Sequence, residues 1–521
     1  MCDGQGGDED CDGLVDTEDD SMSSSNLPTW TVDADGDGYG AIGGSTRRQC
    51  DEPSGYAITA DDCDDDDRNV NPGETEVCGN GIDDNCNNAS DGCGLTGAYS
   101  LSAADLVVTG PSSGSFGLSV CGGGDIDGDG MDDVVFGAPT YSNDGTGYAF
   151  YGGVSGNKTY SNADVVFTGE SSGDQFGYAC TLGDFDGDGE ADVAFSDPRY
   201  SYSTSSSYLY SGRVYLFHTA LSSSEAASSA NTIYTNTNNG GDYIGWSLSS
   251  GDWNGDGNAD LVVGAQENYV FIDNGTIGTS SSKDIFGINE MEGAVSYNGV
   301  VASGGDVDGD GSDDLIVTDV SSKGAAYLYV GEIAGVVTLS SYLEATVTGA
   351  ANSDALGNSA DIRGDLDGDG YDDLLVGASA QGGGVGSVYG CFGPLTGSKT
   401  ATSCSLVIAG QSSSGNFGAS VAYIGDENGD GDDDILVGAP WVTGDRTSSG
   451  VAYLFRGTLS GSKRASDADA SFAGSHSSGG VGSAVGRAGD FNGDGSDDLL
   501  IGGYPANSGT GMGYVMFGGG F

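Results

Sequence analysis

From residue 95 onward the chain alternates between short apolar runs and turns rich in Gly, Ser and Asp. A typical run is Val134-Val135-Phe136, and no segment shows the 3.6-residue period of an amphipathic helix. Short apolar and β-branched runs bounded by Gly and Ser are typical of β-strands. The pattern therefore predicts an all-β fold.

One sequence unit recurs seven times in this region. Its core is Asp-x-Asp/Asn-Gly-Asp-Gly-x-x-Asp followed by an apolar strand, and six units carry an apolar-Gly pair, such as Phe116-Gly117, eight or nine residues earlier. The loops open at Asp125, Asp184, Asp252, Asp306, Asp365, Asp426 and Asp490, at spacings of 59, 68, 54, 59, 61 and 64 residues. Each unit contains four strand signals. Four short strands in about 60 residues, repeated seven times, predict a seven-bladed β-propeller.

The two ends of the repeat region predict how the ring closes. The seventh unit stops after its third strand, at residues 514–517, and a spare strand of the fourth type lies before the first unit, at residues 104–110. Pairing of these strands would leave no open sheet edge. We therefore expect two domains: a Cys/Asp-rich module over residues 1–94 and a propeller over residues 95–521.

The Asp-rich loops predict calcium sites. In the loop of residues 184–192, carboxylates at positions 1, 3 and 5 converge, and Gly at position 6 allows the tight turn. A carbonyl at position 7 and a carboxylate at position 9 complete the six or seven oxygen ligands that Ca²⁺ prefers, whereas Mg²⁺ demands a smaller octahedral shell. About seven Ca²⁺ ions are expected in the propeller. The predicted ligand residues are Asp125, Asp127, Asp129, Met131, Asp133, Asp184, Asp186, Asp188, Glu190, Asp192, Asp252, Asn254, Asp256, Asn258, Asp260, Asp306, Asp308, Asp310, Ser312, Asp314, Asp365, Asp367, Asp369, Tyr371, Asp373, Asp426, Asn428, Asp430, Asp432, Asp434, Asp490, Asn492, Asp494, Ser496 and Asp498.

Charge narrows the range of partners. The formal net charge is −64, so nucleic acid and anionic membrane surfaces are excluded as partners. No apolar run approaches the roughly 18 residues of a membrane helix. Seven Ca²⁺ ions would still leave about −50. The expected ions therefore relieve repulsion locally and join the first and second strands of each blade, and no base or nucleophile beside them indicates catalysis.

The cysteines are concentrated near the N-terminus. Seven of the eleven precede residue 95, which favours disulfides in an oxidising compartment over zinc, because paired Cys-x-x-Cys spacing is absent. Cys391 and Cys404 flank a predicted hairpin and could form a local disulfide. Cys121 and Cys180 occupy equivalent positions before their loops and are expected to be buried small side chains. The chain shows no signal peptide, so we expect a truncated start of an exported protein.

A second type of Asp loop lies in the N-terminal module. It provides Asp33, Asp35 and Asp37 as candidate metal ligands, but position 9 is Ala41, so its ligand set is incomplete. Cysteines alternate with further acidic residues up to Cys86. A solvated acidic linker is the alternative, but the cysteines favour a calcium module stabilised by disulfides.

Two resemblances follow from these motifs. The apolar-Gly pair, the Asp-rich loop and Gly-Ala-Pro, complete at residues 137–139 and 438–440, resemble the FG-GAP repeat of the integrin α-subunit propeller over residues 95–521. Unit four diverges most, with Thr318-Asp319-Val320, and unit two has Ser196-Asp197-Pro198. The N-terminal module resembles Cys/Asp-rich metal-binding repeats of secreted bacterial, especially myxobacterial, proteins, and also thrombospondin type 3 repeats.

The integrin resemblance implies where a ligand would bind. It places the calcium loops on one face and the loops of residues 138–147, 197–212 and 439–450 on the other. Those loops contain Tyr141, Arg199, Tyr200, Tyr202, Trp441 and Arg446, residue types that suit a protein or glycan contact. Simple Ser/Gly-rich spacers are the alternative. The resemblance implies an extracellular or secreted bacterial protein with an adhesive or ligand-binding function.

An enzyme and a structural surface spacer are the competing functions. Propellers also host polysaccharide lyases and hydrolases. However, His218 ends a third strand, His476 lies in a Ser/Gly loop, and no nucleophile motif is present. We therefore expect a non-enzymatic protein. Arg363-Gly364-Asp365 spells an adhesion tripeptide, but Asp365 is also position 1 of a calcium loop, so we interpret it as a coincidence.

Overall fold

The computed structural model describes residues 28–49, 52–74, 82, 86, 94–171, 173–201, 210–218, 221, 223–235, 241, 243–266, 270–273, 280–284, 289–292, 299–331, 337–338, 342–444, 446–504 and 509–519. The chain divides into two compact units, residues 1–94 and 95–520. Within the described ranges, no helix is long and apolar enough to cross a membrane.

The described part of the first unit is built on a three-stranded sheet. Its strands are β1 (Thr29–Val32), β2 (Thr46–Arg48) and β3 (Tyr56–Ala57), with β1 in the centre and both neighbours antiparallel to it. A disulfide joins Cys63 and Cys86, as expected for this segment. Its other cysteines, Cys2, Cys11, Cys50, Cys78 and Cys93, lie outside the described residues.

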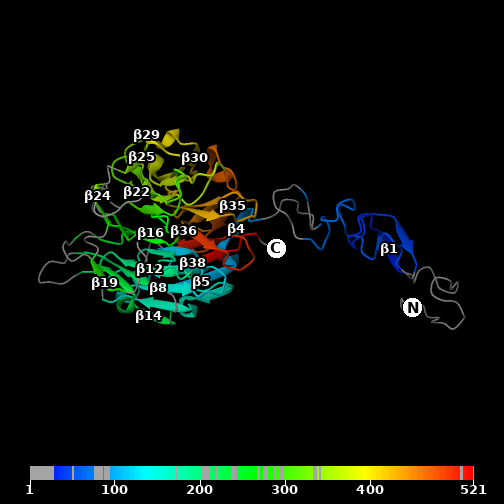
Figure 1. Ribbon diagram of the computed structural model, residues 1–521, viewed down its shortest axis with the longest axis horizontal. Coiled ribbons are helices and arrows are strands. Elements are labelled where there is room, and N and C mark those ends of the chain that lie inside the picture. Colours follow the sequence, from blue (N-terminus) through cyan, green and yellow to red (C-terminus); the bar gives the residue numbers. More distant parts are fainter. Residues whose placement is uncertain are drawn as a thin grey trace. The chain divides into compact units, whose positions relative to one another are not determined.

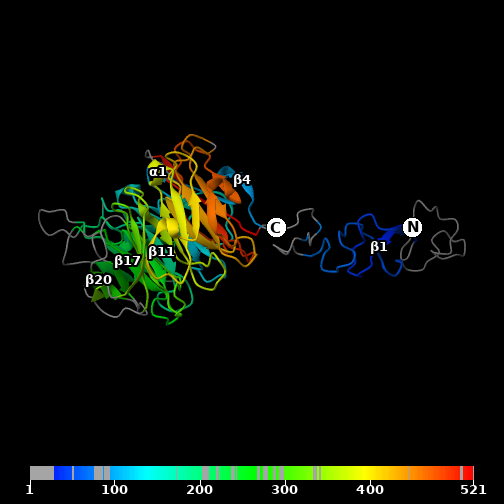
Figure 2. The same cartoon turned by 90° about the horizontal axis from the view of Figure 1, so that it is seen from above.

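The second unit is an all-β propeller, which confirms the predicted fold class (Figures 1 and 2). Its described residues form seven five-stranded sheets, which we number as blades 1 to 7 in the order of the sequence units. The innermost strands contact one another in a closed cycle. They are β6 (Val120–Gly124), β11 (Cys180–Gly183), β16 (Ser247–Gly251), β21 (Val301–Ser303), β26 (Leu356–Asp361), β31 (Ser420–Gly425) and β36 (Val481–Gly489).

Blade 1 shows how each sheet is built. From the inside outward its own strands are β6, β7 (Asp133–Ala138), β8 (Thr146–Phe150) and β10 (Val165–Thr168), all antiparallel. A fifth strand, β14 (Ser224–Ala226), then pairs parallel with β10 and comes from the second sequence unit. The sequence predicted four strands for each blade, so the fifth is a correction.

Every blade receives such a fifth strand from the segment that leads into the fourth strand of the following blade. These edge strands are β14, β19 (Ser280–Asp284), β24 (Val337–Thr338), β29 (Gly397–Thr400), β34 (Gly461–Arg464), β4 (Gly97–Ser100) and β9 (Gly156–Thr159). Those with described side chains are largely exposed and polar, for example Gly-Ser-Lys-Thr in β29. Because no apolar alternation marks them, the pattern of hydrophobic positions did not reveal them.

Residues 97–112 close the ring by joining two blades. In blade 7, β38 (Thr510–Met516) pairs antiparallel with β5 (Leu106–Ser112), and the two lie side by side in Figure 1. In blade 6, β4 is the edge strand and pairs with β35 (Ala470–Ala473). The first strands of the propeller therefore complete its last two blades, and a purely sequential array of sheets is ruled out.

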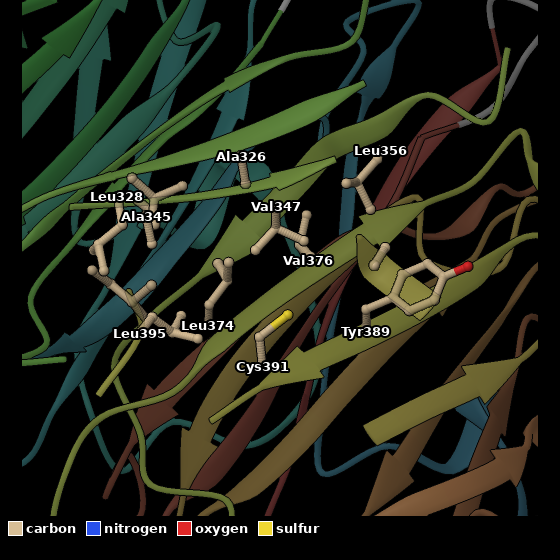
Figure 3. Close-up of a cluster of buried hydrophobic side chains, with 14 of the residues drawn as sticks. Ala326, Leu328, Ala345, Val347, Leu356, Leu374, Val376, Tyr389, Cys391 and Leu395 are labelled. Atoms are coloured by element: carbon tan, nitrogen blue, oxygen red, sulfur yellow. The ribbon is translucent and has the colours of Figure 1, made fainter. Parts of the chain in front are cut away.

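Apolar side chains fill the spaces between neighbouring blades. In one such cluster, Leu328 and Val347 of blade 4 pack with Leu374 and Val376 of blade 5 (Figure 3). All four are buried, and each contributes about 1.5–3 kcal/mol when fully removed from water. This packing fixes the blades on which the Asp loops are mounted.

Candidate metal centres and ligand-binding face

All seven propeller loops share one conformation. The position 1 carboxylate accepts a hydrogen bond from the position 6 glycine amide at 2.7–3.0 Å, as Asp125 does from Gly130. The position 5 carboxylate accepts the position 7 amide at 2.9–3.1 Å, as Asp129 does from Met131. Gly130 has φ +93°, a conformation that a side chain would disfavour. Backbone amides therefore orient the position 1 and position 5 carboxylates in the same way in every loop.

The position 9 aspartate lies at the base of each loop. These seven residues are at most 1 % exposed, and five of them begin the second strand of their blade, as Asp133 begins β7. Asp133 accepts the amides of Ile126 and Gly152 at 2.6 and 2.8 Å. Burial raises the pKa of Asp133 to about 7 and that of Asp434 to about 8, because a buried carboxylate loses its hydration. A bound cation would favour the ionised form of these groups.

The structure brings the predicted ligands together in several loops. Asp125, Asp127 and Asp133 offer oxygen atoms that lie within 4.8 Å of one another, as does the set Asp306, Asp308 and Asp314 and the set Asp184, Asp186 and Asp188. Buried Oδ1 atoms of Asp186, Asp314 and Asp490 have no hydrogen-bond partner in the described part of the chain. Carboxylate oxygens left in this state fit a hard cation with oxygen ligands.

The acid at position 8 has a different role. Asp372 of blade 5 accepts the amide of Asp306, position 1 of blade 4, at 2.7 Å. Equivalent bonds of 2.5–3.1 Å are made by Asp132, Asp313, Asp433 and Asp497. In six of the seven boundaries the position 8 amide also donates to the preceding position 1 carbonyl. Neighbouring loops are thus linked through the backbone of a predicted ligand residue.

His218 is a further residue at these sites that sequence reasoning missed. Its Nδ1 lies 3.0 Å from Asp192 and 3.4 Å from Asp186, within the loop of blade 2. Burial opposes the charge of His218, but the hydrogen bond with Asp192 and the charge of Asp186 raise its pKa overall. His218 directly follows the third strand, as expected, but its contacts with two predicted ligand residues were not expected. The sequence offered one indication of this contact: His218 directly follows the third strand of its unit, at the position that Tyr151 occupies in unit one.

Two of the cysteine predictions have different outcomes. A disulfide joins Cys391 and Cys404 within blade 5, which confirms that prediction. Cys121 and Cys180 also form a disulfide, between β6 of blade 1 and β11 of blade 2, so the expectation of separate buried side chains was wrong. Equivalent positions on adjacent innermost strands come close together, here with Cα atoms 6.0 Å apart. Both cysteines line a central cavity of about 180 Å³, together with Arg363 and Arg487.

The tripeptide of residues 363–365 is engaged within the protein. Arg363 makes two hydrogen bonds of 2.9 Å to Asp361, and Asp365 accepts the amides of Gly368 and Gly370 at 2.7 Å. Both charged groups of the tripeptide therefore have partners within blade 5.

The ligand-face candidates are spread over three blades at the end opposite the loops. Arg199 and Arg446 are exposed, whereas Tyr141, Tyr200 and Trp441 are half-buried. Tyr202 lies outside the described residues.

Blade 2 gathers charged and aromatic groups around two of these candidates. The Arg213 guanidinium lies 3.6 Å from the centre of the Tyr200 ring and donates to Glu170 at 2.7 Å. Arg199 lies 6.0 Å from the Tyr210 ring, which in turn contacts Tyr243 at 5.3 Å. Three tyrosines and two arginines therefore form a cluster at this end of blades 2 and 3.

Sequence reasoning missed two aromatic residues at the mouth of the central channel. Tyr178 and Trp246 each follow an apolar-Gly pair and contact each other with ring centres 5.0 Å apart. They line a cavity of about 280 Å³ with serine side chains from several blades, including Ser359. Burial raises the pKa of Tyr178 to about 12. The sequence position of these two residues could have indicated this location. The residue after each apolar-Gly pair comes shortly before an innermost strand, and the innermost strands surround the channel.

Comparison with protein families matches both parts of the chain. The family described as "FG-GAP repeat" matches residues 116–151, 176–217, 244–279 and 357–390. The family described as "Putative metal-binding motif" matches residues 1–17 and 62–92. The acidic clusters of the Asp loops therefore lie in a chain that matches both a metal-binding motif and the FG-GAP repeat.

Curated relatives include integrin α subunits. Integrin alpha-5 of Xenopus laevis is 29 % identical over 216 residues, covering 40 % of this chain and 20 % of the relative. Integrin alpha-V of Gallus gallus is 28 % identical over 222 residues, covering 39 % and 20 %. The chain thus spans about a fifth of the length of these relatives. A crystal structure of BBS1N in complex with ARL6DN, soaked with lead, has 12 % identity and a TM-score of 0.42, covering 75 % of this chain and 89 % of that chain. The fold, the loop geometry, the two family matches and the integrin relatives together show that the chain carries an integrin-α-like FG-GAP propeller, preceded by a metal-binding motif.

Proposed function

We propose that this chain is an extracellular, non-enzymatic, calcium-dependent binding protein whose propeller holds a protein or polysaccharide ligand on the face opposite the Asp loops. In this proposal Ca²⁺ occupies the seven loops, bound by the carboxylate and amide side chains at positions 1, 3, 5 and 9 and the carbonyl at position 7. The positive charge of the metal offsets the repulsion between the surrounding carboxylates. The integrin-like repeats and the disulfides support an extracellular location.

The observation that carries the ligand-binding part is the aromatic mouth of the channel. Tyr178 and Trp246 are both half-buried and line a concave cavity, so they offer ring faces without being packed into the core. The Tyr200–Arg213 contact lies at the same end of blade 2, at the connection between its second and third strands. Aromatic and arginine side chains in such a setting are the usual energetic centres of protein and sugar contacts.

A non-enzymatic role is supported by the state of the carboxylates. Those in the loops accept backbone amides and surround a common centre, which suits a structural ion. His218 is engaged with Asp192, and His476 lies in an exposed loop beside the Ser475 hydroxyl at 3.0 Å. These groups are not arranged as a nucleophile with a base and an oxyanion site.

Binding of the purified full chain to a glycan array and to extracellular protein fractions tests this function. We expect retention by one of these two classes in Ca²⁺ and loss of retention in EGTA. Trp246→Ala should weaken binding by about tenfold or more, because a central aromatic contact is removed. Tyr342→Ala is the control and should bind normally, because this half-buried residue precedes the fourth strand of blade 4 (Leu343–Thr348) at the end where the Asp loops lie. Equal binding with EGTA, or no binding to either class, would contradict the proposal, and turnover of an arrayed glycan would favour the enzyme alternative.

A further inference from the structure

The Asp loop of the N-terminal module has the same backbone conformation as the propeller loops. Asp33 accepts the amides of Gly36 and Gly38 at 2.7 and 3.2 Å, and Asp37 accepts the Tyr39 amide at 2.8 Å. The corresponding bonds in the first propeller loop are 2.7, 2.8 and 2.9 Å. The same side chains are therefore oriented in the same way, although the loop follows β1 of a different sheet.

This loop lacks the acid that every propeller loop has at position 9. The residue there is Ala41, whereas Asp133 fills the position in blade 1 and is fully buried. Asp133 also accepts the position 2 amide, that of Ile126, at 2.6 Å. A loop without this residue has lost one carboxylate ligand and the acceptor for one amide.

The structure places Asp62 beside the vacant position. Asp62 pairs with Ala41 in a parallel bridge, with the Ile42 amide 2.7 Å from the Asp62 carbonyl and the Asp62 amide 3.0 Å from the Gly40 carbonyl. Its side chain is 1 % exposed. Oδ1 accepts the Asp64 amide at 2.9 Å, but Oδ2 is buried and has no hydrogen-bond partner in the described part of the module.

The loop beside Asp62 offers matching oxygen atoms. One carboxylate oxygen from each of Asp33, Asp35 and Asp37 lies within 4.8 Å of the other two. Oδ2 atoms of Asp35 and Asp37 are also buried and unpartnered within the described residues. The position 2 amide of this loop, that of Ala34, donates to Asp65 at 2.7 Å. In blade 1, Asp133 both offers a carboxylate to the loop and accepts the position 2 amide. In the module, Asp62 is placed to offer the carboxylate and Asp65 accepts the amide.

We propose that Asp62 completes a divalent-cation site with Asp33, Asp35 and Asp37, supplying from 29 residues downstream of position 1 the carboxylate that the loop lacks. All of the donors are oxygen atoms, a set that suits a hard cation, and Ca²⁺ is the ion assigned. Cys63, the next residue, is joined to Cys86. The ion therefore ties the loop of β1 to a segment that the disulfide holds, and neither connection depends on the propeller.

Hydrogen exchange of the full-length chain, followed by mass spectrometry with excess Ca²⁺ or with EGTA, tests this site peptide by peptide. In the unmodified chain, Ca²⁺ should slow exchange over residues 34–42 by about tenfold or more. Asp62→Asn keeps the shape of the side chain but should abolish most of this effect. Asp61→Asn removes one charge from the exposed neighbouring residue and should leave the effect unchanged.

A rescue variant separates ligation from a purely structural role. Ala41→Asp combined with Asp62→Asn restores a carboxylate at position 9 and should recover the Ca²⁺-dependent protection. If Asp62→Asn alone disrupts the module, seen as loss of the Cys63–Cys86 linkage, the combined variant still decides the question. The inference is overturned if Asp62→Asn behaves like Asp61→Asn, if the combined variant fails to recover protection, or if the unmodified loop does not respond to Ca²⁺.

The same experiment reports separately on the proposed function. Peptides from the seven propeller loops should keep their Ca²⁺ response in every module variant. If those peptides do not respond while residues 34–42 do, calcium in the propeller is contradicted and the module site stands.

Discussion

The boundaries between blades are of two kinds, and they differ at position 8 of the loop. Five boundaries have an aspartate there, such as Asp372, whose carboxylate holds the position 1 amide of the preceding blade. The other two have Ala191 and Ala259. Both alanines still donate their amides to the preceding position 1 carbonyl, at 2.7 and 2.9 Å. The backbone contact therefore occurs in six of the seven boundaries, with either residue at position 8, and the carboxylate adds a second contact where an aspartate is present.

The two alanine boundaries are reinforced by other means. Between blades 1 and 2 the Cys121–Cys180 disulfide links the innermost strands. Between blades 2 and 3, the Ser250 hydroxyl donates to the Leu182 carbonyl at 2.6 Å. The glycine before each loop accommodates either arrangement, since a Cβ on Gly124 would lie 2.8 Å from Ala191 and one on Gly425 would meet the Asp497 carboxylate. Repeats can thus exchange side-chain contacts while the backbone geometry stays fixed.

Removal of calcium should weaken both kinds of boundary and have the largest effect. Each of the seven proposed ions adds about 2.7 kcal/mol at a hundredfold excess over its Kd, so chelation should lower Tm by on the order of 20 °C. Differential scanning calorimetry with EGTA, and with EGTA plus excess Ca²⁺ as control, measures this. A Tm that is indifferent to chelator would refute a structural role for the metal.

Loss of the inter-blade disulfide should have the next largest effect. Cys121→Ser combined with Cys180→Ser removes a cross-link between residues 59 positions apart and should lower the unfolding free energy by about 2–4 kcal/mol. Urea denaturation in Ca²⁺ measures the change. The matched control is Cys391→Ser with Cys404→Ser, which opens a link of 13 positions inside one blade and should cost less. Equal losses of unfolding free energy in the two double variants would show that the disulfide between blades 1 and 2 stabilises the protein no more than the one within blade 5.

Removal of one position 8 carboxylate should have a smaller effect. Asp372→Ala leaves the Asp306 amide without its side-chain acceptor and should cost about 1–3 kcal/mol of unfolding free energy. Asp372→Asn keeps an acceptor and should cost less. Urea midpoints for the two variants make the comparison, and an unchanged midpoint for Asp372→Ala would mean that the aspartate and alanine boundaries are equivalent.

Much of the propeller could be predicted because its strands have a buried side. Apolar runs such as Val134-Val135-Phe136, which are fully buried in β7, showed the all-β class, and the repeated loops indicated the blades. The fifth strands could not be predicted, because β29 and β34 are polar and their pairing partners lie in another unit. Local sequence does not contain the information about such a partner.

The candidate sites show the same division. Ligand positions within a loop could be predicted from spacing, since carboxylates at alternate positions of a tight turn converge. Contributions from outside the loop could not: His218 reaches the blade 2 loop from the end of the third strand, and Asp62 reaches the module loop from a later segment. The Cys121–Cys180 disulfide depended on the spacing of adjacent innermost strands, which equivalent positions in two repeats suggest but do not establish.

The blade 1–2 boundary also differs from the others on the face opposite the loops. Asp197 replaces the alanine of Gly-Ala-Pro and is fully buried, and Asp174 is 8 % exposed. Oδ2 of each has no hydrogen-bond partner in the described part of the chain, although the Gln175 amide donates to Asp197 Oδ1 at 2.9 Å. Burial and the neighbouring Asp174 raise the pKa of Asp197 to about 8. Two buried acids, each with one unpartnered oxygen atom among the described residues, therefore lie close to each other on this face.

The smallest expected effect is the pH dependence of this pair. An acid whose pKa rises from 3.8 when unfolded to about 8 when folded favours folding in its protonated form, so its cost grows as pH rises through this interval. Asp197→Asn removes that cost, keeps the acceptor for Gln175 and can donate toward Asp174. The stability gained over the unmodified chain should therefore increase from pH 4 to pH 8, level off above, and reach about 1 kcal/mol or more. Urea denaturation across this range in Ca²⁺ measures it, with Asp144→Asn, a residue on the blade 1 side, as a control for charge alone. A gain that is independent of pH would mean that Asp197 is ionised in the folded protein and has a partner that compensates its charge.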